Sequence, residues 1–143
     1  MLVSCLYASR VTTPLPAVVL DQILEQSHRN NPRRGITGLL CSTNDVFVQV
    51  LEGGRDEVCD LYNAIVRDER HSQVRLLAYE EIAERRFANW TMGQVDVKTI
   101  NPSLLLKYSK TASLDPFAIT GQATMALLTE LVATGSITRR TTV

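Results

Sequence analysis

The residues best suited to chemistry in this chain are a phenol and an amide set among apolar residues. Gln49 interrupts the apolar run from Val46 to Leu51, and Tyr7 lies in a short, largely apolar segment that begins at Leu2. A buried primary amide has two donor hydrogens and two acceptor lone pairs, and leaving them unpaired costs about 1–3 kcal/mol. A buried tyrosine hydroxyl also needs a partner, and an amide on a neighbouring strand would serve. Gln49 at a sheet rim bonded to water, or Tyr7 bonded to a backbone carbonyl, would equally satisfy these groups, so the pair alone leaves its role open.

Further polar residues follow two helical segments. Asn30 and Asn31 either terminate the first of these or present an amide to a ligand. Asp68, Arg70 and His71 close the second, where cations are favoured by the helix dipole. A histidine next to an arginine is a poor metal ligand, so we expect no metal site.

Trp90 and Met92 are two residues apart in a segment with strand character. Alternation along a strand would place both side chains on the same face of the sheet, where packing in the core is their default role. Phosphate-binding glycine loops, nucleophile elbows and other common catalytic motifs are absent from the sequence. Residue spacing by itself therefore predicts a small ferredoxin-like domain with a polar cluster beneath its helices.

The composition restricts the class of partner. Lys and Arg number 15, as do Asp and Glu, so the formal net charge is zero and argues against binding to nucleic acid. The same neutrality offers little resistance to self-association. The three cysteines have no metal-like spacing and indicate a reducing compartment. Because the sequence contains neither a signal peptide nor an apolar stretch of roughly 20 residues, we expect a soluble, cytoplasmic protein with no membrane contact.

Hydrophobic periodicity predicts seven elements in the first two thirds of the chain. In order, they are a strand at 2–9, a helix at 17–29, strands at 36–42 and 46–51, a helix at 56–67, and strands at 74–79 and 90–97. We expect Pro32 to end the first helix, because the residue before a proline avoids the helical region. Gly53 and Gly54 are expected to end the third strand.

This order, βαββαββ, predicts an α+β, ferredoxin-like sheet with both helices on one face. The other face would be bare without a cover. Residues 98–143 offer a helical cap, with a short helix at 102–107 and a longer one opened by Asp115 and Pro116. The longer helix carries an apolar stripe of Leu127, Leu128, Leu131 and Val132. We therefore expect a domain at 1–97 followed by a helical extension at 98–143.

Several motifs, at matching separations from Leu2 to about Val95, carry a family resemblance. They are the strand end LYAS and the segments RNNPRRGITGLL, FVQVLEGG, IVRDERH and RRFANWTMG. The chain resembles the BLUF domains, sensors of blue light using FAD. The resemblance implies a non-enzymatic photoreceptor that binds FAD without a covalent bond, and the same ring contacts would suit FMN or riboflavin.

The resemblance also implies roles for individual residues. Tyr7 would give an electron to the excited flavin, and Gln49 would bridge Tyr7 and the polar edge of the flavin ring. Trp90 and Met92 correspond to a pair that would exchange places near Gln49 during signalling. The further flavin neighbours implied by motif position are Ser9, Ile23, Asn31, Phe47, Ile65, Asp68, Arg70 and His71. Asn30 stands where some members carry histidine, which leaves the chemistry intact.

Signalling would then pass through the segment around Trp90 and Met92 to the helices beyond Asn101. The residues after position 97 are too few for a catalytic effector, so we expect the output to reach other subunits or an unidentified partner protein. The resemblance implies a homo-oligomer, either a dimer or a larger ring. Two alternatives remain at this stage: an acylphosphatase-like enzyme using Arg34 and Asn31, which would lack its glycine-rich loop, and an interaction module without flavin.

Overall fold

A five-stranded sheet forms the centre of the protein, and helices cover both of its faces. The computed structural model describes residues 1–12, 16–43 and 45–134 of the 143-residue chain. The elements are β1 (Leu2–Val11), α1 (Pro16–Arg34), β2 (Thr37–Ser42), β3 (Val46–Gly54), α2 (Arg55–Arg67), β4 (His71–Ile82), β5 (Gly93–Asp96), a 3-10 turn (Val97–Thr99), α3 (Pro102–Tyr108) and α4 (Gly121–Ala133). The last residues of the predicted extension, 135–143, lie outside this description.

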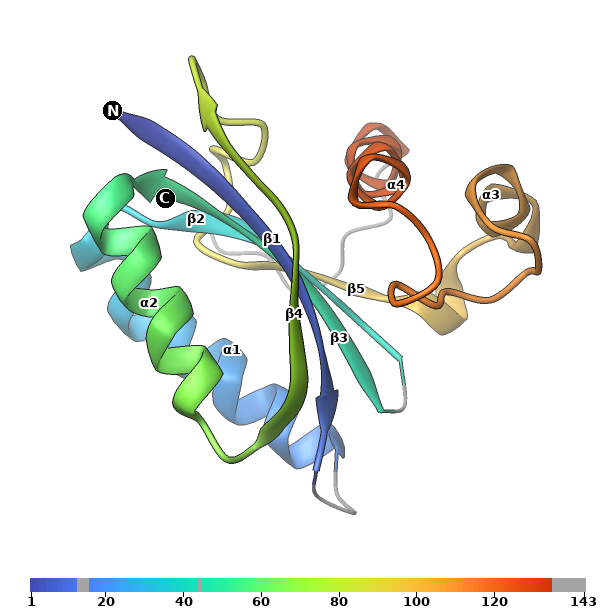
Figure 1. The fold of residues 1–143 in the computed structure, drawn as a ribbon, viewed down its shortest axis with the longest axis horizontal. Helices are drawn as coiled ribbons and strands as arrows, with labels where there is room; N and C mark the ends of the chain where they lie inside the picture. The colour runs from blue at the N-terminus through green and yellow to red at the C-terminus, as the bar shows by residue number, and fades with distance from the viewer. Residues whose placement is uncertain (13–15, 44, 135–143) are drawn as a thin grey trace.

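The strand order confirms the ferredoxin-like α+β arrangement. The order is β4-β1-β3-β2-β5, with β1 antiparallel to both β3 and β4 and with β2 antiparallel to β3. The short β5 runs parallel to β2. Figure 1 shows α1 and α2 on one face of the sheet and α3 and α4 on the other, as predicted for the helices and for the cap.

Strand alternation sorts the core into two clusters, one on each face of the sheet. On the face of α1 and α2, the cluster includes Val3, Cys5 and Tyr7 from β1. On the face of the cap, it includes Leu6 from β1 together with Leu127, Leu128 and Leu131 from α4. Val132 packs against the cap-side cluster and is partly buried. The apolar stripe predicted for the last helix is therefore what covers the second face.

The end of α1 differs from the prediction, because the helix continues past Pro32 to Arg34. The Gly35 N–H donates to the Pro32 carbonyl at 3.3 Å, and the Ile36 N–H donates to the Asn31 carbonyl at 3.0 Å. These are the two bonds of a Schellman motif, with Gly35 in the left-handed conformation at φ 65°. The stop signal is thus Gly35, and Pro32 is tolerated in the last turn.

Three other boundaries differ from the predictions. β3 runs through Gly53 and Gly54, where extended glycines continue the pairing with β1. β4 is longer than predicted at both ends and includes Gln73 at φ 49° beside an irregularity in its pairing with β1. Asp115 opens a turn, in which its side chain accepts from the Phe117 N–H at 3.1 Å, and α4 begins only at Gly121 after the N-cap Thr120.

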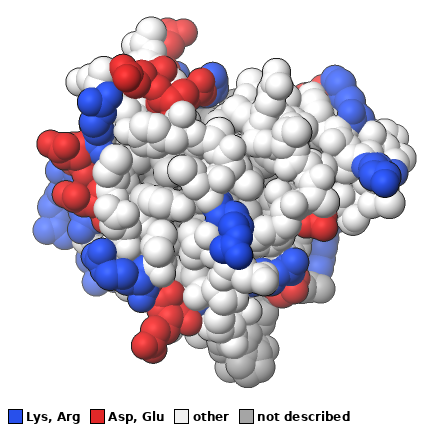
Figure 2. Space-filling view, viewed as in Figure 1, with Lys and Arg blue, Asp and Glu red and all other residues white. Residues whose placement is uncertain are grey.

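β4 forms one edge of the sheet and lies toward the viewer in Figure 1. In Figure 2, the same view, charged side chains gather mainly around the rim and few lie in the centre. Two large apolar side chains on β4 are well exposed, Leu76 at 52% and Tyr79 at 42%. None of the helices in the described part of the chain is long and apolar enough to cross a membrane.

Candidate functional site

The centre of the site is a hydrogen bond between two adjacent central strands. Tyr7 on β1 pairs in register with Gln49 on β3, so the two side chains leave the sheet side by side on the face of α1 and α2. The Tyr7 hydroxyl donates to Gln49 Oε1. Both residues are almost fully buried. Of the alternatives that the sequence left open, the structure selects the pairing of the phenol with the amide.

The other end of the Gln49 amide reaches the segment that precedes β5. Gln49 Nε2 donates to the Met92 sulfur at 3.3 Å, so the amide bridges Tyr7 and Met92. Trp90 and Met92 do not share a face, contrary to the prediction, because β5 begins only at Gly93 and strand alternation does not apply to them. Met92 belongs to the core cluster of the helix face, whereas Trp90 belongs to that of the cap. The chain between them therefore passes from one side of the sheet to the other.

Each backbone carbonyl of this short segment has a partner on a different part of the fold. The Trp90 carbonyl accepts from the Gly38 N–H at 3.1 Å. The Thr91 carbonyl accepts from Asn31 Nδ2 at 3.3 Å, and the Met92 carbonyl lies 3.3 Å from His28 Nε2. Asn31 is buried. A movement of this segment would therefore alter hydrogen bonds to both α1 and β2.

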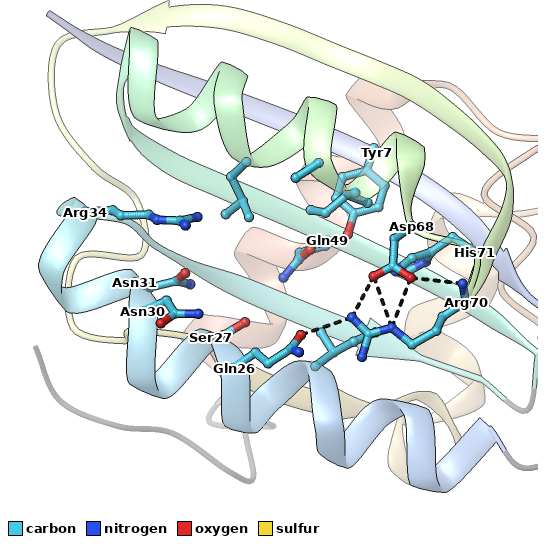
Figure 3. A pocket seen from close by; sticks show the side chains of 14 residues that line it. Tyr7, Gln26, Ser27, Asn30, Asn31, Arg34, Gln49, Asp68, Arg70 and His71 are labelled. Carbon is cyan, nitrogen blue, oxygen red and sulfur yellow. Dashed lines mark hydrogen bonds and ion pairs between the residues drawn. The ribbon is translucent and has the colours of Figure 1, made fainter.

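A cavity between α1 and α2 opens over Tyr7 and Gln49 (Figure 3). Arg34 lies at one end of it, and Asp68, Arg70 and His71 lie at the other. Its lining is Tyr7, Ile23, Gln26, Ser27, Asn30, Asn31, Arg34, Gln49, Leu61, Ala64, Ile65, Asp68, Arg70 and His71. The cavity thus brings together eight of the ten cofactor-site and photochemical residues named from the sequence.

Asp68 and Arg70 form a tight pair at the end of the cavity. Arg70 Nη2 lies 2.6 Å from Asp68 Oδ2, and Arg70 Nε donates to both carboxylate oxygens. The hydrogen bonds from Arg70 lower the pKa of Asp68, so the carboxylate stays charged. Arg70 Nη2 also donates to Gln26 Oε1 on α1 at 3.0 Å. The pair therefore connects the segment after α2 with the opposite wall.

Ser9 and Phe47 are the two predicted cofactor-binding residues that do not line the cavity. Ser9 Oγ lies 2.8 Å from His71 Nδ1, and the Phe47 ring meets the His71 ring edge-on at 5.9 Å. Both residues therefore contact His71, which lines the cavity, without lining the cavity themselves. Burial lowers the pKa of His71, which favours a neutral imidazole in this position.

The environment of Tyr7 determines what its hydroxyl can do. Burial strongly raises the pKa of Tyr7, so its proton does not leave by simple ionisation at neutral pH. The Tyr62 ring approaches edge-on at 5.7 Å and adds to the dry surroundings. A buried phenol bonded to an amide is suited to losing a proton only when an electron leaves with it.

Six residues that line the cavity are not among the ten predicted from the sequence. Gln26, Ser27, Asn30 and Arg34 lie on α1, whereas Leu61 and Ala64 lie on α2. Ile23, Ser27, Asn30 and Arg34 recur at helical spacing and so share one face of α1. This helical spacing could have identified the cavity face of α1 from the sequence. It was missed because the predicted helix ended at residue 29, before Asn30 and Arg34.

The donor set of the cavity fits a flavin ring. A flavin is planar and apolar with a hydrogen-bonding edge, and it calls for aliphatic walls and a few amides. Ile23 and Ile65 offer such walls from α1 and α2, while Asn31 and Gln49 offer amides. No group of His, Cys, Asp and Glu side chains among the described residues could hold a metal ion.

Comparison with known proteins agrees with this chemistry. The family described as sensors of blue-light using FAD matches residues 2–93. The photoactivated adenylate cyclase subunit beta of Euglena gracilis is 37% identical over 87 residues, which are 60% of this chain and 10% of that protein. The chain thus spans about a tenth of the length of such curated relatives.

Solved structures match over a much larger share of their length. BlrB, a BLUF protein in its dark state, superposes with a TM-score of 0.79 at 32% identity, over 94% of this chain and 96% of that one. The photo-activated state of BlsA superposes with a TM-score of 0.85 at 28% identity, over the full length of both chains. With its fold, its buried Tyr7–Gln49 pair and its matched residues 2–93, this chain belongs to the BLUF family of blue-light sensors.

Proposed function

We propose that this protein senses blue light with FAD held between α1 and α2, and that Tyr7 and Gln49 are its photochemical pair. The observation that carries this proposal is the buried chain of contacts from Tyr7 through Gln49 to Met92. FAD follows the description of the family, and the same walls and amides would accept FMN or riboflavin. Asn31, Asp68, Arg70 and His71 would meet the polar side of the cofactor, and Ile23 and Ile65 would pack on its ring.

The first step belongs to Tyr7. Bound flavin supplies a chromophore that absorbs blue light and, once excited, accepts an electron. Tyr7 would give that electron and release its hydroxyl proton toward Gln49 Oε1, which already accepts from it. Both particles return to Tyr7 when the charge recombines. Burial keeps Tyr7 protonated before illumination, so the phenol is ready for this coupled transfer.

The second step belongs to Gln49. Its two ends differ in hydrogen-bonding character, so rotation or tautomerisation of the amide exchanges a donor for an acceptor. Either change would replace the contact of Nε2 with the Met92 sulfur. A new hydrogen bond to the carbonyl edge of the ring would shift its absorption to the red. Because no covalent bond forms, the change would reverse in the dark.

We further propose that residues 1–97 act as the sensor and that the helices after them carry the signal. Trp90 already packs in the cap-side cluster with Leu105 and Leu128, which gives Met92 a neighbour that reaches the cap. The protein itself would perform no catalysis, and its output would act on other copies or on a downstream protein. The exposed Leu76 and Tyr79 on the edge strand β4 favour a homo-oligomer, either a dimer or a larger ring.

The absorption spectrum before and after blue illumination tests the proposed function. We expect the purified protein, supplied with flavin, to be yellow and to show a small red shift that decays in darkness. A protein that stays colourless with excess FAD, FMN and riboflavin would contradict flavin binding. A yellow protein without a reversible shift would contradict the photochemistry. Extraction of the cofactor and chromatography against the three standards identifies the flavin.

A further inference from the structure

Glu52 is a fully buried carboxylate that the proposed photochemistry does not use. It lies on β3, three residues beyond Gln49, and none of its surface is exposed. A buried charge is costly unless it is hydrogen-bonded. Glu52 Oε2 accepts from the Arg86 N–H at 2.9 Å, and Oε1 accepts from the Phe87 N–H at 2.8 Å. Both carboxylate oxygens thus accept hydrogen bonds from two consecutive backbone amides.

These amides belong to the long connection between β4 and β5, outside any helix or strand. Arg85 reinforces the same attachment point. Its Nη1 donates to Thr37 Oγ1 at 2.8 Å and to the Glu52 carbonyl at 3.2 Å, and its Nη2 donates to the Gly35 carbonyl at 2.7 Å. Three successive residues of the connection are therefore bonded to one corner of the sheet.

From this attachment the connection leads directly to the residues near Gln49. Phe87 is buried in the cap-side cluster with Trp90, and the Trp90 N–H donates to the Phe87 carbonyl at 3.3 Å. Two residues later Met92 is on the opposite face and accepts from Gln49. β3 thus contacts this connection twice, through Glu52 at Arg86 and Phe87 and through Gln49 at Met92.

We propose that Glu52 is a positioning residue for signalling: it holds Arg86 and Phe87 fixed on β3, so that a change at Gln49 moves Trp90 and is not absorbed elsewhere in the connection. This role rests on the proposed function of Gln49. A segment held at only one of two contacts would relax around a change at the other. Glu52 holds one end of the stretch from Phe87 to Met92, and the Trp90 and Thr91 carbonyls hold its middle to Gly38 and Asn31. A change at Met92 therefore reaches the cap through the Trp90 side chain, which packs in the cap-side cluster.

The chemistry of Glu52 explains why a carboxylate suits this position. The two backbone donors bond to different carboxylate oxygens, and an amide side chain would offer only one oxygen. Burial raises the pKa of Glu52, while the bonds from Arg86 and Phe87 and the charges of Arg85 and Arg86 act in the opposite direction. Glu52→Gln keeps the size of the side chain, removes one acceptor and turns an amide N–H toward a backbone N–H.

Trp90 is the one tryptophan of the sequence, so its indole signal reports on this segment alone. The experiment records the flavin spectrum and the ¹H–¹⁵N signal of the Trp90 indole in flavin-loaded, full-length protein, in darkness and under blue light. Glu80→Gln is the matched control, because Glu80 Oε1 accepts from the Arg86 side chain at 2.8 Å rather than from its backbone and is half exposed.

We expect the red shift in wild type, Glu80→Gln and Glu52→Gln alike. The light-induced change of the Trp90 signal should persist in Glu80→Gln and fall about twofold or more in Glu52→Gln, because one of the two backbone bonds is lost. A full change of the Trp90 signal in Glu52→Gln would overturn the role of Glu52. A loss of the red shift in Glu52→Gln would also overturn it, because Glu52 would then act on the photochemistry. Wild type without any red shift would instead overturn the proposed function, and this role with it.

Hydrogen exchange in the unmodified protein tests the same role if Glu52→Gln does not fold. The amides of Arg86 and Phe87 should be protected like strand amides in both darkness and light, because the attachment persists through the cycle. Release of these two amides under light, to the rate of exposed connection residues, would overturn the proposal.

Discussion

At the scale of single residues, one amide has two different neighbours. Gln49 accepts from a phenol at one end and donates to a thioether at the other. The Met92 sulfur is a weak acceptor, so its bond is easily replaced when the amide changes orientation. The Tyr7 bond, in contrast, joins two strong hydrogen-bonding groups in dry surroundings. The amide is therefore held firmly on the side of Tyr7 and loosely on the side of Met92.

Replacing Tyr7 with Phe tests the electron donor. The variant keeps the ring that packs beside Tyr62 but lacks the hydroxyl bonded to Gln49. We expect it to bind flavin and to lose the reversible red shift, as measured by absorption before and after blue light. Tyr62→Phe is the control, because Tyr62 is only partly buried and makes ring contact with Tyr7. It should retain the shift, and a normal photocycle in Tyr7→Phe would refute the assignment.

His71 predicts a pH dependence of stability. Burial lowers its pKa below the ordinary histidine value of about 6.5, so the folded state favours the neutral ring. This contribution to the free energy of unfolding is complete above pH 6.5 and is lost as the pH falls through the folded-state pKa. Denaturant unfolding with saturating FAD should therefore show that wild type loses more stability than His71→Gln between about pH 7.5 and about pH 5.5. Equal losses in the two proteins would contradict this reasoning.

At the scale of elements, the end of α1 determines where its polar face lies. The helix extends through Asn31 and Pro32 to Arg34, which keeps Asn31 on the face that meets Thr91 and the cavity. The Schellman motif at Gly35 then turns the chain directly into β2. If the helix ended at Arg29, as the proline rule suggested, Asn31 would lie in a loop without a fixed direction.

Gly35→Ala tests this helix end. A Cβ on Gly35 would meet only Arg85 Nη2, at 3.9 Å, so the cost comes from the backbone and not from a clash. At φ 65° a residue with a Cβ is strained by about 1–2 kcal/mol, and we expect that loss in the free energy of unfolding. Gly35→Asn should lose less, because asparagine adopts the left-handed region more readily. Equal stability of Gly35→Ala and wild type would argue against the motif.

At the scale of the whole molecule, one sheet separates the face of the Tyr7–Gln49 pair from the face covered by the cap. Tyr7, Gln49 and the cavity lie on the side of α1 and α2, while the cap covers the other side. α4 approaches the sheet so closely that a Cβ on Gly121 would collide with the Leu77 carbonyl of β4. The connection from Phe87 to Met92 is where the two faces meet.

Leu128→Ala tests how far the cap supports the fold. Leu128 is fully buried against the sheet, so its truncation should lower the free energy of unfolding by about 2–5 kcal/mol. Leu106→Ala is the control, because Leu106 on α3 is 52% exposed and should cost about 0.5 kcal/mol or less. Both are measured by denaturant unfolding. Similar losses in the two variants would mean that the cap contributes little to stability.

The order of elements, the ferredoxin-like sheet and the apolar stripe of α4 could all be predicted from the sequence, because periodicity and turn residues are local properties. Gln49 and Tyr7 could be singled out for a similar reason, since a polar side chain in an apolar strand is visible in the sequence alone. The boundaries were less accessible. The proline rule ended α1 too early, because the Schellman motif at Gly35 continues the helix through Pro32. The start of β5 depends on its pairing with β2, which is far away in the chain.

By itself, the sequence thus determined the fold class and the identity of a polar pair on two strands, since these follow from residue types and their spacing. Only the tertiary structure decided that Tyr7 and Gln49 are partners, because that requires the register of β1 against β3. It also decided that Met92 meets Gln49 while Trp90 faces the cap. These two side chains separate because the chain crosses the sheet before β5 begins. Glu52 holds that crossing on β3, and its bonds to Arg86 and Phe87 exist only when the fold brings these distant residues together.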